Sequence, residues 1–472
     1  MSESLQFAAV KRRAVASRSY RTRLPASNGL NFAPGGTIQF DLPANLAGTY
    51  VDMSQCYLKF KVNNDATDDL NLDRAGAYGF IRRLQISTAG AQISDLDRYN
   101  VLAAAMIDQD TSLEWRGSHG KTLIGTETSL RGEQVVATSS RTYCLPIILN
   151  PLAQTTPHRM IPCFSLSSLT LRWTMADIAE AVVAGATPGV TFTDVEMVCM
   201  LTELSPGAQA MVDSATGGRY DILATSWAYS GGSLAAGVTS STTNLGFSYS
   251  SLERVVFALR PQASQVQGAY SLGNRATAHL SEYNLLVNSQ QYPAQPIRRE
   301  DKGAESLSEL LISDHSLLDW RSGSAFTNGF KSASVANGAG LGFSMFANIQ
   351  PRVTIDPAYP FSDNNPAGTT AGDSIDLDGV GVAGIVPSDI GTFLASIELE
   401  SAISNGKSSH IYSGVSTLAS TVQLVTKHSS AVVGACSIDT FANFTILMSL
   451  NMRGTGVFSV SVWANHKKQN IW

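Results

Sequence analysis

The chain has 472 residues, of which 15% are charged and 44% are apolar. About 25% charged residues is usual, so this chain is poor in charge, as suits a protein whose flanks are covered by other protein. Five cysteines, never spaced as Cys-x-x-Cys, indicate neither a disulfide framework nor a zinc site. No apolar run approaches the roughly twenty residues that cross a bilayer. Disulfide-stapled, zinc-ribbon and helical membrane proteins are therefore excluded.

The start of the chain is basic. Residues 1–23 hold six basic residues against one acid, a balance of +5, so the remainder carries −10 to reach the net −5. An apolar lead-in over 5–10 would let this segment lie as a short amphipathic helix on an anionic surface; the alternative is a solvated tail. We expect residues 1–29 to form an arm that belongs to neither domain, with the anionic contact made by Lys11, Arg12, Arg13, Arg18, Arg21 and Arg23.

After the arm, the first half is predicted to consist of β-strands joined by loops. Alternating or continuous apolar runs bounded by turn residues predict the strands, and an apolar-periodic run after a polar turn at 87–90 predicts a helix over 95–106. The predicted strands cover 36–43, 57–62, 80–86, 143–149, 168–174 and 192–201.

The second half repeats the pattern after a turn-rich stretch. A polar turn at 288–291 is again followed by a helix-like run, here over 306–312. Residues 321–340 are rich in Gly, Ser, Ala and Asn, and residues 356–391 carry several prolines and glycines. Both are long enough to be projecting loops at one end of the domain, and 121–140 is their counterpart in the first half. The predicted strands cover 220–227, 247–259, 280–287, 341–349, 393–399, 422–426, 444–450 and 457–463.

The two halves share an order of elements: strand, long connection, strand, turn, short helix. The step between them is about 200 residues, which indicates a duplicated β domain. About eight strands per half with short helices only in the connections is the outline of a jelly roll. We therefore predict an all-β fold of two eight-stranded jelly rolls side by side, with Leu84 and Ile86 in one core and Leu285 and Val287 in the other. The expected divisions are 30–205, a linker at 206–219, and 220–472.

Sites for catalysis or cofactors are weakly indicated. Seven histidines form no metal-binding spacing, and no nucleophile, base and orienting acid can be assembled. The acidic run from Asp373 to Asp378 lacks the bidentate acid of an EF-hand, which leaves an irregular surface cation site open. We predict no enzyme activity and no cofactor.

Two segments carry a resemblance to a known family. Residues 283–288 (Tyr-Asn-Leu-Leu-Val-Asn) with 291–297, and residues 80–84 with 97–100, resemble corresponding stretches of double jelly-roll major capsid proteins. This lineage includes shell proteins of adenoviruses, tailless membrane-containing phages, virophages and polinton-like viruses. The resemblance implies a virion protein that forms trimeric, pseudo-hexagonal capsomers of an icosahedral shell.

The implied partners are two further copies of the chain, neighbouring capsomers and minor capsid proteins, with an internal membrane or the genome as the contact of the arm. Since neither roll was expected to include it, removal of residues 1–23 should leave folded trimers. One alternative is a two-domain β-sandwich that binds or cleaves glycans, for which Trp115, Trp227 and Trp320 would supply an aromatic platform. A minor vertex or spike protein of a similar virion is a further alternative.

Overall fold

The computed structural model describes two separated stretches of the chain. They are residues 17–313 and 393–463, with gaps at 43–45, 47, 89–90, 112–114, 128–131, 156–157, 166–167, 182–188, 266–271, 273–274, 300–303, 401–413, 433 and 453–457. The predicted loops 321–340 and 356–391, the strand 341–349, Trp320 and the acidic run from Asp373 to Asp378 lie outside the described residues.

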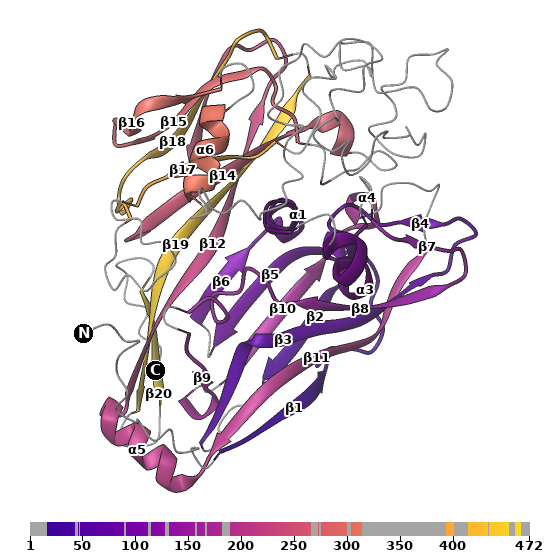
Figure 1. The fold of residues 1–472 in the computed structure, drawn as a ribbon, viewed down its shortest axis with the longest axis vertical. Coiled ribbons are helices and arrows are strands. Elements are labelled where there is room, and N and C mark those ends of the chain that lie inside the picture. The colour runs from indigo at the N-terminus through magenta and orange to yellow at the C-terminus, as the bar shows by residue number, and fades with distance from the viewer. Residues whose placement is uncertain are drawn as a thin grey trace, which may run out of the picture.

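The first roll consists of two facing antiparallel sheets (Figure 1). One sheet has the order β1-β11-β3-β8, with short β9 (Ile161–Pro162) beside β3. Its strands are β1 (Ser17–Pro25), β3 (Thr49–Asn64), β8 (Ser140–Pro146) and β11 (Val190–Leu204). The other has the order β2-β10-β5-β6, made of β2 (Thr37–Leu42), β5 (Ile81–Thr88), β6 (Ala91–Leu96) and β10 (Leu169–Met175).

The second roll repeats this architecture. One sheet has the order β12-β19-β14-β17, with β20 (Phe458–Trp463) beside β19. Its strands are β12 (Arg219–Leu234), β14 (Leu252–Pro261), β17 (Ala395–Glu398) and β19 (Cys436–Met452). The other has the order β13-β18-β15-β16, made of β13 (Ser240–Leu245), β15 (Leu280–Val287), β16 (Gln290–Arg298) and β18 (Val422–His428).

The strand order is the same in both rolls. Counting the eight principal strands from the start of each roll, the sheets read 1-8-3-6 and 2-7-4-5 in both halves. This arrangement, with each sheet built from strands far apart in the chain, is a jelly roll. The predicted duplication is confirmed.

The connections hold short helices, as predicted. Helix α1 (Tyr99–Asp110) follows β6 and α6 (Ala304–Ser313) follows β16, so they occupy equivalent places. The remaining short elements are β4 (Leu70–Asn71), β7 (Gln134–Val135), η2 (Gly76–Phe80), η3 (Arg116–Gly120), α3 (Lys121–Ile124), η4 (Cys163–Ser165), α4 (Ile178–Ala181), α5 (Pro206–Thr216) and η5 (Gln262–Gln265). No helix in the described ranges is long and apolar enough to span a membrane.

The cores lie where the alternating patterns of the sequence indicated. Strands β5 and β15 have the same pattern of buried and half-buried positions along their eight residues. Leu84, Ile86 and Leu285 are 0% exposed and Val287 is 6% exposed, because alternate side chains of a strand point to one face of the sheet. The predicted core residues of both rolls are therefore confirmed.

The sequence-based assignment of the N-terminal arm and the linker needs correction. Residues 17–25 are not part of an arm: they form β1, which pairs along its whole length with β11, from Ser17 opposite Leu204 to Pro25 opposite Glu196. The premise that removal of residues 1–23 spares both rolls is therefore wrong. The stretch expected as a linker holds α5, capped by Ser205 at its start and by Gly217 in the left-handed conformation at its end.

Two further strands were missed where a turn was expected to lead straight into a helix. Strand β6 stands between the turn at 87–90 and α1, and β16 stands between Asn288 and α6. Asn288 and Ser289 both have positive φ angles (48° and 71°), which suits the tight turn of a hairpin. Pro293 and Pro296 can occupy β16 because it is an edge strand, where a missing N–H costs no ladder hydrogen bond.

Candidate functional site

The predicted basic residues divide between a described strand and a stretch outside the described residues. Lys11, Arg12 and Arg13 belong to the latter. Arg18, Arg21 and Arg23 are exposed on β1. They therefore belong to a sheet instead of an arm, with Arg21 and Arg23 on one face and Arg18 on the other, over the ring of Tyr20.

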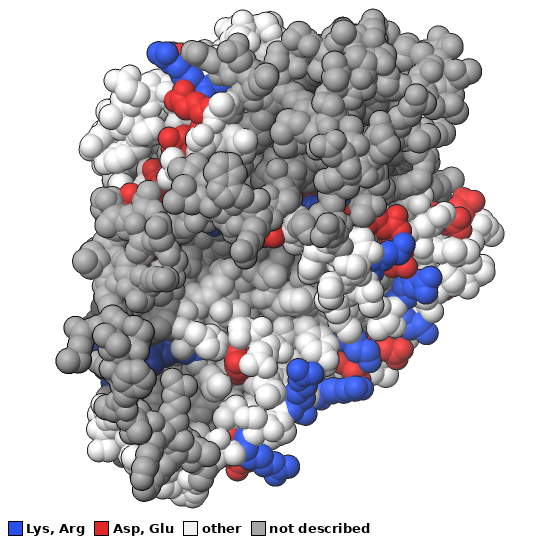
Figure 2. Space-filling view, viewed as in Figure 1, with Lys and Arg blue, Asp and Glu red and all other residues white. Residues whose placement is uncertain are grey.

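Basic side chains continue from β1 across its sheet. Arg23 lies 3.7 Å from Glu196 on β11, and the same carboxylate lies 3.2 Å from the ammonium of Lys59 on β3. Lys61 follows two residues later on the same face of β3. Basic and acidic side chains gather along the lower right of the molecule, where β1, β11, β3 and β8 lie (Figure 2). This outer face, here called the basic face (Arg21, Arg23, Lys59, Lys61 and Glu196), is open to solvent in one copy of the chain.

The second feature is the joint between the two rolls. Strand β6 of the first roll lies against β12 of the second (Figure 1). Ser94 and Ser226 are 3.2 Å apart across the joint, and the rings of Phe164 and Tyr220 meet edge to face at 5.8 Å. Buried apolar side chains run from one roll into the other as one connected cluster. The two rolls are thus packed as one unit.

A buried carboxylate holds the joint together. Asp108, near the end of α1, accepts hydrogen bonds from the guanidinium groups of Arg74, Arg116 and Arg275. Arg275 belongs to the second roll, in the connection before β15, while the other two belong to the first. All four side chains are at most 5% exposed. Removal of this single carboxylate would leave three buried cations close together.

Two buried acids at this cluster have pKa values shifted in opposite directions. Burial alone would raise the pKa of Asp108, but the positive charges of Arg74, Arg116 and Arg275 outweigh it and the pKa falls well below its usual range. Nearby Asp73 accepts a hydrogen bond from the backbone N–H of Leu272 in the second roll, at 2.8 Å. Burial raises the pKa of Asp73 to about 6.

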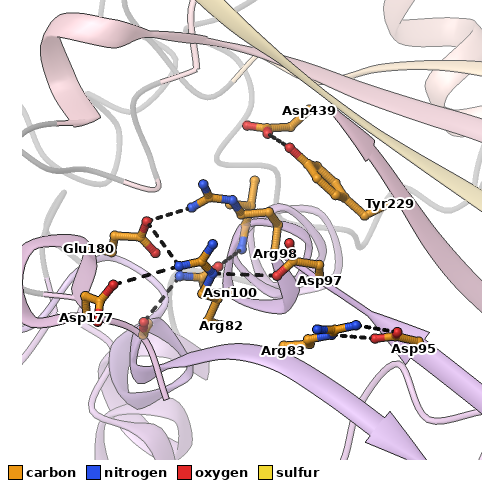
Figure 3. A network of polar contacts seen from close by, with 12 residues as sticks. Arg82, Arg83, Asp95, Asp97, Arg98, Asn100, Asp177, Glu180, Tyr229 and Asp439 are labelled. Carbon is orange, nitrogen blue, oxygen red and sulfur yellow. Dashed lines mark hydrogen bonds and ion pairs between the residues drawn. The ribbon is translucent and has the colours of Figure 1, made fainter. Parts of the chain in front are cut away.

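A second polar network lies where the start of α1 meets β12 (Figure 3). Arg98 precedes α1 with a positive φ of 52°, and its side chain donates to Glu180 at 3.0 Å. Across the joint, the hydroxyl of Tyr229 donates to Asp439 at 2.9 Å, and Asp439 also pairs with Arg260. Asp439 and Arg260 are both 1% exposed. The charges of Asp439 and Arg260, on the outer face of the second roll's sheet, are therefore buried and paired with each other.

A cavity of about 590 Å³ also lies between the rolls. Trp115 and Trp227 line it, together with the carboxylates of Glu253, Glu398 and Glu400. Burial raises the pKa of Glu253, and it raises the pKa of Glu398 to about 7.

Trp227 does not offer this cavity a free aromatic face. Trp227 is 2% exposed, and the guanidinium carbon of Arg254 lies 5.1 Å from its ring centroid. The face on which a sugar ring would stack is therefore taken by a side chain of the protein. In the described part of the chain, no group of three or more His, Cys, Asp or Glu side chains is arranged to hold a metal ion.

Comparison with solved structures shows the same architecture in proteins of several virus capsids. The PBCV-1 capsid, a quasi-atomic model, gives a TM-score of 0.56 at 10% identity over 96% of this chain and 98% of that chain. PBCV-1 VP54, fitted into a reconstruction of the virophage Sputnik, gives 0.55 at 11% identity over 96% and 98%. The Faustovirus major capsid protein gives 0.52 at 8% identity over 94% and 92%.

This chain has the double jelly-roll fold. The match extends over nearly the full length of both partners, so the pair of rolls is shared and not just one of them. No protein-family model matches the sequence, and no curated protein matches it either. The fold is thus similar to capsid proteins at an identity too low for sequence comparison to detect.

Proposed function

We propose that this double jelly-roll chain is the major capsid protein of an icosahedral virus and forms trimeric, pseudo-hexagonal capsomers in the virion shell. The observation that carries the proposal is the rigid pairing of two rolls with the same strand order. Two similar rolls per chain give a block with two similar outer sides, and three blocks around a threefold axis give six. Such a ring can tile a hexagonal lattice through side-to-side contacts with neighbouring capsomers and minor capsid proteins. The likeness to the Faustovirus major capsid protein supports this function.

Native mass spectrometry of the purified full chain tests the proposal. A trimer that persists at low micromolar concentration is the expected result, since a shell protein needs preformed capsomers. A glycan-binding or glycan-cleaving module would instead remain a monomer and bind an oligosaccharide array. A monomer at every concentration tested would contradict the capsid proposal.

We further propose that the N-terminal segment contacts an anionic partner through Lys11, Arg12 and Arg13, the basic residues of the chain's start that precede β1. A membrane is favoured over bare genome because the apolar residues 5–10 adjoin these charges, and an interfacial helix needs an apolar face. Co-sedimentation with vesicles of anionic lipid measures the contact. Replacement of the three residues by Gln should abolish binding and its salt dependence, while equal binding by the variant would contradict the contact.

A further inference from the structure

The outer faces of the two equivalent sheets have opposite environments. The two sheets can be aligned by treating Leu58 of β3 and Phe257 of β14, which both face inward, as equivalent. The strand registers then assign an equivalent residue to each neighbouring position of the two sheets. The residues of the basic face then correspond to residues at the joint. The pairs are Arg21 with Trp227, Arg23 with Tyr229, Lys59 with Ala258, and Glu196 with Asp439.

In three of the four pairs, the member at the joint is buried and the member on the basic face is more exposed. Trp227, Ala258 and Asp439 are at most 2% exposed, while Tyr229 is half-buried. By contrast, the side chain of Arg23 is 69% exposed, and those of Lys59 and Glu196 are 27% and 30% exposed. Within one chain, the outer face of the β1-β11-β3-β8 sheet is therefore less covered than that of the equivalent β12-β19-β14-β17 sheet.

The opposite edges of the rolls show the complementary difference. In the first roll, β6 and α1 supply the cover, and residues 99–109 of α1 are buried on all sides. In the second roll, the corresponding elements β16 and α6 have nothing in the described chain on their outer side. Tyr292 and Pro293 of β16 and Leu307, Leu311 and Ile312 of α6 are half-exposed, and Ala294 is exposed. The surface formed by β16 and α6 therefore has no sheet to cover within the described chain, whereas β6 and α1 cover the sheet of the second roll.

We propose that a second copy of this chain joins these two surfaces: β16 and α6 of one copy cover the basic face of the next. The joint between the two rolls of one chain serves as the template for this contact. A contact between two different surfaces of the same chain is head to tail, and it closes into a ring when the rotation permits. If each roll occupies one sixth of a turn, the ring closes with three copies. The inference rests on the proposed capsid function and assigns the surfaces that build its trimer.

Charge favours this partner. Helix α6 carries Glu305 and Glu309 and no basic residue, and burial and the charge of Glu305 raise the pKa of Glu309. On the basic face, the four basic side chains outnumber the single carboxylate of Glu196, which pairs with Arg23 and Lys59. On the other surface, the exposed Arg298 of β16 offsets one of the two acids of α6. The balance is negative there and positive on the basic face, which favours association and sets its orientation.

Charge reversal tests the contact, with native mass spectrometry of the full chain as the measurement. One variant carries Arg21→Glu and Arg23→Glu, a second carries Glu305→Arg and Glu309→Arg, and a third carries all four changes. Arg172→Glu is the matched control, because Arg172 is an exposed arginine on the outer face of β10, in the opposite sheet. Thermal unfolding verifies that each variant is folded, and Arg→Gln and Glu→Gln versions replace any that is not.

Each two-residue variant should dissociate at protein concentrations at least about tenfold higher than the wild type does, and the four-residue variant should recover most of the loss. The control should form trimers like the wild type. Trimers of normal stability in either two-residue variant, or no recovery in the four-residue variant, would overturn the assignment of these surfaces and leave the capsid proposal standing. If the first variant formed normal trimers but no longer bound DNA, the basic face would be a nucleic-acid contact. That outcome would also overturn the proposed contact between copies. A wild-type chain that never forms trimers would contradict the capsid proposal itself.

Discussion

Strands β1 and β12 begin the two rolls and hold the same place in their sheets, but their surroundings differ. Strand β1 has nine residues and none is buried, whereas β12 has sixteen and its central Ser226 and Trp227 are buried. Their backbones make the same kind of ladder with β11 and β19. The topology therefore determines the position of a strand in its sheet, while the residue types on its outer face depend on whether that face is exposed or buried. Arg21 and Arg23 are exposed, whereas at the equivalent positions the indole of Trp227 is buried and the phenol of Tyr229 is half-buried.

The largest effect is expected at the buried carboxylate of the joint. Asp108→Ala leaves Arg74, Arg116 and Arg275 without their shared counter-ion, and loss of one partner of a buried ion pair costs about 3–5 kcal/mol. Urea unfolding followed by tryptophan fluorescence, at one fixed protein concentration, measures the change. Asp177→Ala is the control, because Asp177 is 63% exposed and its ion pair is long at 3.8 Å. A loss under about 1 kcal/mol for Asp108→Ala would show that the joint does not depend on this cluster.

Two equivalent acids, Asp439 and Glu196, differ in burial between the rolls and should therefore differ in their effect on stability. Asp439→Asn neutralises a carboxylate buried against Arg260, and we expect a loss of about 3 kcal/mol. Glu196→Gln changes the equivalent acid on the open face, where the cost should be under about 1 kcal/mol. The same unfolding measurement serves both variants, at a protein concentration low enough that the chain is a monomer. Equal losses there would mean that the two faces are equally covered within one copy of the chain, which would contradict the difference between the rolls.

The cavity between the rolls predicts a pH dependence. The pKa of Glu398 is raised from 4.5 to about 7 by burial, so its favourable contribution is complete below pH 4.5 and is lost as the pH rises through 7. At about 1.4 kcal/mol per pKa unit, reduced by partial exposure, the loss should be about 2 kcal/mol between pH 5 and pH 8. Glu398→Gln should flatten this slope and be the more stable form at pH 8. If the wild type lost no more stability than Glu398→Gln between pH 5 and pH 8, the raised pKa of Glu398 would be contradicted.

The smallest effect is expected for a single hydroxyl at the joint. Tyr229→Phe removes the hydrogen bond to Asp439 and keeps the ring, so a loss of about 1 kcal/mol is expected. Arg23→Ala, at the equivalent open position, should leave the unfolding free energy of the monomer unchanged within about 0.5 kcal/mol. A larger loss for Arg23→Ala than for Tyr229→Phe in the monomer would reverse the comparison.

Sequence patterns were sufficient for the duplication, the jelly-roll class and the core of each roll. The alternation around Leu84 and Leu285 is local, and burial of one face follows from it directly. Strand β1 was missed because its arginines suggested an arm, although Tyr20, Thr22 and Leu24 alternate with them. Its pairing with β11 joins residues more than 170 positions apart, and no local pattern reveals such a partner.

The charged side chains of the joint could not be found from the sequence for the same reason. Asp108 and Arg275 are separated by 167 positions, and each looks like an ordinary surface charge by itself. The one local signal is an aspartate that follows seven apolar residues of α1, from Val101 to Ile107. A charge in such a run is a candidate for burial, but its partners depend on the fold.

A cryo-EM map of the purified oligomer tests the central claim most directly. The account predicts six rolls around a threefold axis, with β16 and α6 of each copy lying over β1, β11 and β3 of the next. The neighbouring copy should then cover Arg21 and Arg23, as Trp227 is covered within the chain. A twofold dimer, or a trimer in which the basic face remains open to solvent, would contradict it.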